Sequence, residues 1–321
     1  MVEILAGRAP VEPETAIQLS RVLGPDADFW IRLDASYRLR LAEANERSNV
    51  EGAREWASRF PLKELHSRKF IPQVSNPADA VPYLLQLFGA GTIAACEERF
   101  DELASVSYRH SPSFRSAEGS LLVWLRLGER QAEEAKAADF DRKLFIAALE
   151  QARSFTDRDV RTFLPWLQRS LASAGVVFVL ERPLSGVALS GVARWVTPRR
   201  ALIQQTLRHK SNDHFWFTFF HEAAHLLHHS RKNTFLDGNE ELERHRKSEE
   251  EEANAWAASF LVPPNAMRAF VAVGHFRKAD VSAFAVREGV APGIVVGQLQ
   301  KLGLIPYSAL NDLKLTLDFP N

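Results

Sequence analysis

The segment "WFTFFHEAAHLLHH", residues 216–229, places two histidines four positions apart around a glutamate, inside an otherwise apolar run. In an α-helix of 3.6 residues per turn, His221 and His225 project from the same face, so both imidazoles reach one metal ion. Glu222 is offset by about 100° on that helix and lies beside the ion without coordinating it in the same way. The spacing predicts a zinc site with a catalytic base next to it.

A catalytic zinc ion takes three protein ligands and keeps one position open, so a third ligand is expected further along the chain. The metzincin pattern requires glycine at 228 and histidine at 231, but the chain has His228 and Arg231, which excludes that class. The run "SEEEEANAWAASFLVPP" (248–264) offers four glutamates at the start of a second helix.

Among these four glutamates, Glu250 lies on the same helical stripe as the small and apolar residues 3, 7 and 11 positions later. Glu251 points most clearly outward, whereas Glu249 and Glu252 remain alternatives. We assign no role to four further histidines, His214, His228, His229 and His245, although His229 follows His225 by one helical turn.

"HEAAH" followed by "EEEANAWAASFLVP" resembles the ImmA/IrrE family of zinc metallopeptidases, whose signature is HExxH and then E-x-x-A-N/D-x-F/W-A-A-x-L-x-x-P. The resemblance spans roughly residues 175–265. It implies one Zn²⁺ per chain, held by His221, His225 and Glu250, with Glu222 as the catalytic base. Asn254 falls where the family carries Asn or Asp, one turn after the third ligand, and is expected to support the ligands.

The resemblance implies a metalloendopeptidase whose substrate is a repressor or a toxin–antitoxin partner, cut in a stress response. The alternative is a DNA-binding antitoxin or regulator whose metal domain does not cleave. Zinc lowers the pKa of a bound water molecule towards neutrality and polarises the carbonyl of the peptide bond. Glu222 is expected to take the proton from that water and deliver it to the leaving amine. An extended substrate is expected to pair with an exposed edge among the strands.

Three segments have the pattern of strands: the β-branched run 175–181, the alternating run 191–197, and 199–207, with glycine and proline between them. Most of the remaining chain has helical periodicity. We therefore expect an α+β fold, mainly helical, with a small antiparallel three-stranded sheet next to the HExxH helix, as in a gluzincin-like peptidase core. A charged loop is expected at 231–247 and a helix at 248–262.

Residues 3–43 contain one predicted helix, 13–24, and nearly all of a second, 26–44, which has Phe29, Leu33 and Tyr37 on one side. This segment resembles the second half of a HigA-like (XRE-family) helix-turn-helix antitoxin domain. The first helices of that domain would lie before Met1, and residues 1–60 carry eight basic and ten acidic residues. DNA is therefore a doubtful partner for this chain, and a homodimer stays an open alternative.

The sequence predicts four regions: a HigA-like remnant (1–48), a helical middle region (49–170), the zinc peptidase core (171–265) and a C-terminal helical tail (266–321). The tail has two short helices around a glycine-containing turn. Packing against the peptidase is the expected role of these helices, and a second helix-turn-helix is the alternative.

Composition sets broad limits on the protein. Forty basic and forty acidic residues cancel, so no overall positive field favours nucleic acid or an anionic membrane. The chain has no signal peptide and no apolar run of about 18 residues, and a cytoplasmic location without a membrane partner is expected. The single cysteine, Cys96, is expected in the core.

Overall fold

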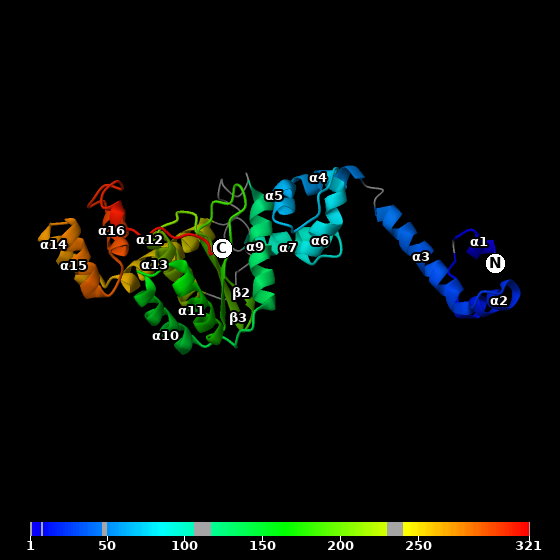
Figure 1. Ribbon diagram of the computed structural model, residues 1–321, viewed down its shortest axis with the longest axis horizontal. Coiled ribbons are helices and arrows are strands. Elements are labelled where there is room, and N and C mark those ends of the chain that lie inside the picture. The colour runs from blue at the N-terminus through cyan, green and yellow to red at the C-terminus, as the bar shows by residue number, and fades with distance from the viewer. Residues whose placement is uncertain (1, 8, 47–49, 106–116, 230–239, 321) are drawn as a thin grey trace.

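A computed structural model describes residues 2–7, 9–46, 50–105, 117–229 and 240–320 (Figure 1). The fold is mainly helical with one small sheet, which confirms the predicted α+β class. The strands are β1 (Val176–Leu180), β2 (Gly191–Thr197) and β3 (Arg200–Gln205). The α-helices are α1 (Val2–Leu5), α2 (Pro13–Leu23), α3 (Ala27–Glu46), α4 (Val50–Ser58), α5 (Leu62–Ser67), α6 (Val81–Phe88), α7 (Ile93–Ser105), α9 (Glu118–Glu134), α10 (Arg142–Ala152), α11 (Val160–Ser173), α12 (Asn212–His228), α13 (Glu240–Leu261), α14 (Pro264–Val273), α15 (Lys278–Glu288) and α16 (Pro292–Lys301). Three 3₁₀ turns, η1 (Pro77–Ala80), η2 (Arg153–Phe155) and η3 (Asn311–Leu313), complete the elements.

The three strands lie where the sequence predicts them, but the sheet is mixed, so the expectation of a purely antiparallel sheet was wrong. The strand order is β1-β3-β2. β3 pairs antiparallel with β2 and parallel with β1. β1 and β2 are the two edge strands, and they run in opposite directions relative to β3. Insertion of β3 between β1 and β2 therefore creates a parallel pair, and it leaves β2 at an edge.

Both faces of this sheet are covered by helices, which explains its nearly continuous burial. Val176 and Phe178 face the main hydrophobic core with α11 and α12, whereas Val177 and Val179 pack with Ala132 of α9. This alternation follows from the two-residue period of a strand. The main core also takes side chains from α10, α11 and the helices after residue 265, so it crosses the predicted boundaries at 170 and 265.

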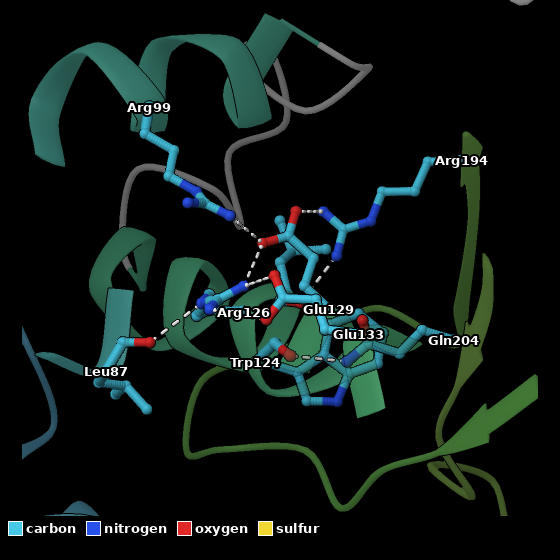
Figure 2. Close-up of polar contacts among 9 residues, drawn as sticks. Leu87, Arg99, Trp124, Arg126, Glu129, Glu133, Arg194 and Gln204 are labelled. Atoms are coloured by element: carbon cyan, nitrogen blue, oxygen red, sulfur yellow. Dashed lines mark hydrogen bonds and ion pairs between the residues drawn. The ribbon is translucent and has the colours of Figure 1, made fainter. Parts of the chain in front are cut away.

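Helix α9 connects the sheet with a second hydrophobic core, built mainly from α4 to α7 and α9 (Figure 1). A buried ion-pair network forms this connection (Figure 2). Arg99 of α7, Arg126 of α9 and Arg194 of β2 each place a guanidinium nitrogen 3.0–3.2 Å from the Glu129 carboxylate. Gln204 of β3 donates a 2.6 Å hydrogen bond to a backbone carbonyl of α9. The middle helices are thereby coupled to the edge strand β2.

Helices α1 to α3 lie at the end of the molecule away from the sheet (Figure 1). α2 begins at Pro13 and ends before Gly24, which confirms the predicted start and stop. The predicted apolar side of α3 is about half exposed, with Phe29 at 47%, Leu33 at 51% and Tyr37 at 49%. Within the described residues, α2 packs against α3 and Gly7 lies close to Tyr37, so this surface is covered only in part.

The C-terminal helices pack on the region around the HExxH helix α12, as the favoured interpretation predicted. α16 contacts α12 and buries Ile294, Val295 and Leu299 in the main core. A helix buried in this way has no free face for a DNA groove, so the helix-turn-helix alternative loses support. Cys96 is fully buried, which confirms its predicted place in a core. None of the helices in the described part of the chain combines the length and apolar character that crossing a bilayer requires.

The predicted loop at 231–247 was wrong in its second half, because α13 already begins at Glu240. The segment "EELERHRK" (240–247) consists mostly of strong helix formers with opposite charges three and four positions apart. High charge alone suggested a loop, but these residues extend the helix that carries the acidic run. Residues 230–239 lie outside the described part, as does the side chain of His245.

Candidate metal centre

The histidine-bearing helix α12 is anchored by its aromatic residues. Phe215, Trp216, Phe219 and Phe220 are buried in the main core. These side chains pack against Phe163 of α11, Phe178 of β1 and Phe260 of α13, and the adjoining side of α12 lies along β2 and α13. His221 and Glu222 lie on or next to that side, as does His225. The aromatic residues therefore fix the orientation of the HExxH segment.

The structure brings His221, His225 and Glu250 together, with one ligand atom from each lying within 4.8 Å of the others. The two histidine Nε2 atoms are 3.1 Å apart. Glu250 places one carboxylate oxygen 3.3 Å from Nε2 of His221 and the other 3.4 Å from Nε2 of His225. Glu250 comes from α13, which packs along α12.

These separations fit a shared metal ion. Ligand atoms bound tetrahedrally to zinc at about 2.0–2.2 Å lie about 3.3–3.6 Å from one another. Two imidazole nitrogens and one carboxylate oxygen form a donor set typical of catalytic zinc. Donor set and spacing therefore both suit a divalent ion, and the ligand role of these residues remains a prediction.

The pKa values of His221 and His225 are shifted in opposite directions by their surroundings. Burial lowers the pKa of His225, and the neighbouring His221 lowers it further, so His225 favours the neutral form that binds a metal. Burial opposes a charge on His221 as well, but its hydrogen bond with Glu250 and the charges of Glu222 and Glu250 raise its pKa overall. Two imidazoles this close cannot both be charged without strong repulsion.

Glu222 is buried next to this cluster, with a side chain positioned by the edge strand β2. The backbone N–H of Ala193 donates a hydrogen bond to its carboxylate. Burial raises the Glu222 pKa to about 7, with Glu250 adding to the rise and His221 opposing it. A carboxylate with a pKa near neutrality is suited to accept and return a proton at physiological pH.

Gly191 of β2 permits the close approach of this strand to α12. A Cβ atom at Gly191 would lie 2.7 Å from Cγ2 of Thr218 and 3.0 Å from Cγ of Glu222. Carbon atoms in contact prefer about 3.5–4.0 Å, so a side chain here would displace the base or the strand. The absence of a side chain at position 191 is therefore part of how Glu222 is placed.

The other predicted positions also fall near the cluster. Asn254 interacts with His221 and raises the pKa of that imidazole, and its role in supporting the ligand stays a prediction. Glu252, an alternative ligand, has its carboxylate near His229 instead. His229 is the residue that the sequence interpretation missed: its Nδ1 lies 2.8 Å from Nδ1 of His225. The spacing of four residues signalled this contact, but only the structure shows which ring atoms meet.

Comparison with known proteins agrees with this geometry. Residues 179–291 match the family described as "Peptidase_M78: IrrE N-terminal-like domain". The matched segment contains β2, β3, α12 and α13, and it extends further towards the C-terminus than the predicted 175–265. A search of curated proteins finds no match to the chain, and neither does a search of solved structures. The family match supports placing residues 179–291 in the ImmA/IrrE family and indicates a metallopeptidase-type domain in this part of the chain.

Proposed function

We propose that the chain is a zinc-dependent metalloendopeptidase in which His221, His225 and Glu250 hold one zinc ion. The observation that carries the proposal is the triangle of ligand atoms, 3.1–3.4 Å apart, with a buried glutamate beside it. When bound, zinc supplies a Lewis acid that makes water reactive near neutral pH and polarises a peptide carbonyl.

Proton transfer and positioning of the ligands are assigned to side chains of the protein. Glu222 accepts the proton of the attacking water and returns it to the leaving amine, a role that suits its raised pKa. Asn254 supports the orientation of His221 through its interaction with that imidazole. Burial of Glu222 limits its contact with bulk water, and this strengthens its electrostatic interactions with the reacting groups.

The substrate chain is proposed to add to β2, which is an edge strand that pairs with β3. The N–H of Ala193 already reaches Glu222 from this strand, so a peptide paired with β2 would lie beside the base. Main-chain pairing holds an extended peptide and demands little of its sequence. A protein substrate with an exposed, extended segment therefore fits this edge.

A pocket near the start of β2 supports a preference among such segments. Its lining includes Arg208, Lys210, His209 and His214. Lys210 pairs with Asp318 at 3.5 Å, and burial lowers the pKa of His209, so Arg208 supplies most of the positive charge. Thr218 also lines it, one helical turn before Glu222. At about 3.3 Å per extended residue, a substrate side chain two to four residues from the cleaved bond would reach it. We expect acidic side chains to be favoured there.

The regulatory context is proposed from the resemblance of the N-terminal segment to a HigA-like domain. On that basis, residues 1–48 are the remnant of a regulator domain, residues 49–170 a helical connection, and 266–321 a tail attached to the peptidase. The substrate is then a repressor or a toxin–antitoxin partner cut in the cytoplasm under stress. The alternative, a DNA-binding regulator with a metal domain that does not cleave, predicts zinc binding without proteolysis.

The test is to incubate the zinc-loaded chain with a co-encoded repressor and to follow cleavage by mass spectrometry. Cleavage is expected to require zinc and to be lost in Glu222→Gln, while zinc content stays at one per chain. Glu251→Gln, which makes the same charge change on an outward side chain, is the matched control. Equal cleavage by Glu222→Gln and wild type would refute the role of Glu222, and zinc loading without cleavage of any candidate would favour the alternative.

A further inference from the structure

His229 lies at the C-terminal end of α12, and its side chain is only 10% exposed. One ring nitrogen, Nδ1, is 2.8 Å from Nδ1 of His225. The other, Nε2, is 3.5 Å from a carboxylate oxygen of Glu252 on α13. The three side chains therefore form a row that leads from the candidate metal centre to the helix surface.

The chemistry of the imidazole ring assigns the protons in this row. Nε2 of His225 faces Glu250 and His221, so it must carry a lone pair to bind a metal ion. The proton of His225 is then on Nδ1, and it is donated to Nδ1 of His229, which accepts. His229 in turn carries its proton on Nε2, which lies 3.5 Å from the Glu252 carboxylate but makes no hydrogen bond among the described residues. Each assignment follows from the previous one.

We propose that His229, whose far nitrogen lies near the Glu252 charge, positions His225 as a metal ligand and fixes its tautomer. The inference rests on the proposed zinc site and adds a residue that touches neither zinc nor substrate. A partner on the second ring nitrogen orients a ligating histidine and increases its basicity, and its loss commonly costs about 10–100-fold in metal affinity. Here that partner is a second histidine from the next turn of the same helix.

The other histidine of the cluster, His221, has no comparable partner on its second ring nitrogen within the described part of the chain. The Nδ1 atom of His221 is buried and has no hydrogen-bond partner among the described residues. The orientation of His221 is therefore supported through Glu250, which reaches its Nε2. His225 is the histidine ligand whose far nitrogen is held, so the geometry of the centre depends on the contact with His229.

The test compares His229→Leu with His229→Asn. Both replacements branch at Cγ, but the Asn Oδ1 atom can take the place of the accepting Nδ1, whereas Leu offers no acceptor. Zinc affinity is measured by competition with a chromogenic chelator on the full chain. His229→Leu is expected to weaken zinc binding about 10–100-fold, and His229→Asn to stay within about threefold of wild type. Equal affinities for the two variants would overturn the proposal.

A second pair of variants changes exposed residues and leaves His229 itself intact. Glu252 is 59% exposed at its side chain, so Glu252→Gln is expected to fold normally. Because Glu252 acts through the longer contact, a smaller loss of about two- to fivefold is expected, against none for Glu251→Gln. No difference between these variants would remove Glu252 from the proposal. If wild type itself bound no zinc, the proposed function would fail, whereas one zinc per chain with unaffected variants would refute the role of His229 alone.

Discussion

Gly128, in the middle of α9, offers a test of how closely this helix packs on the sheet. By helix propensity alone, Gly128→Ala should stabilise the protein by about 1 kcal/mol. In the structure, however, a Cβ atom there would lie 2.0 Å from Oε1 and 2.2 Å from Cδ of Gln204. Gln204 is fully buried and donates to the carbonyl of Trp124, as Figure 2 shows. The substitution must therefore displace a buried, hydrogen-bonded side chain.

The sizes of the opposing energies decide whether Gly128→Ala stabilises or destabilises the protein. Overpacking of this kind costs about 1–3 kcal/mol, and loss of the Gln204 hydrogen bond costs about 0.5–1.5 kcal/mol more. Together these exceed the propensity gain, so we expect Gly128→Ala to destabilise the protein by about 1–3 kcal/mol. For a chain of this size the thermal midpoint should fall by roughly 1–5 °C.

A double-mutant cycle provides the control, with thermal and urea unfolding as the assays. In a Gln204→Ala background the obstructing side chain is gone, so Gly128→Ala should now stabilise by up to about 1 kcal/mol. The reversal of sign between the two backgrounds is the specific expectation. An equal effect in both would show that Gln204 is not the obstacle, and stabilisation in the wild-type background would refute the close approach of α9 to β3.

Three further predictions concern the candidate centre and the second core. Glu250→Ala should lower the zinc content measured by elemental analysis well below one per chain, whereas Glu251→Ala should leave it unchanged; full zinc in both would exclude Glu250 as a ligand. Gly191→Ala should retain zinc but lose about tenfold or more in kcat, because its Cβ would displace Glu222; wild-type turnover would contradict this placement. Burial raises the pKa of Cys96 to about 12, so its thiol stays protonated at pH 8 and should resist alkylation until the chain is unfolded; rapid labelling of the native protein, followed by mass spectrometry, would argue against its burial.

The predicted acidic preference of the pocket near β2 is tested with quenched fluorescent peptides that differ by Glu, Gln or Lys at one position. Glu should be favoured about three- to tenfold in kcat/KM, and the preference should shrink at high salt because exposed charges are screened. A preference that is unchanged by salt, or one for Lys, would contradict the electrostatic reasoning. Cleavage of all three peptides at one rate would remove the pocket from substrate selection and leave the peptidase proposal intact.

Much of the candidate centre was predictable because its signals are local. Two histidines four apart must share a helical face, and the glutamate that shares a stripe with the buried positions of the next helix was the best third ligand. The strands were predictable for a similar reason, since β-branched runs between glycine and proline have few other structures. Each of these interpretations depends on periodicity within about 20 residues.

The interpretations that failed depend on contacts between distant segments. The side chains at 175–181 and 199–207 give no sign that β3 inserts beside β1, so the parallel pair was missed. The apolar side of α3 was visible as a pattern, but periodicity cannot say how much of it the rest of the chain covers. The start of α13 was placed late because charge was taken as a sign of a loop although the helix propensity was high.

The sequence by itself determined the chemistry that is available: which histidines and glutamates share faces, and which segments are strands or helices. Only the tertiary structure decided how these groups act on one another. It brought α13 against α12, so that Glu250 meets both histidines, and it placed Ala193 of β2 against Glu222. It also joined His229 to His225 through particular ring nitrogens. The physical reason is that helical and strand periodicity are properties of the local backbone, whereas distances between elements depend on which buried surfaces fit together across the whole core.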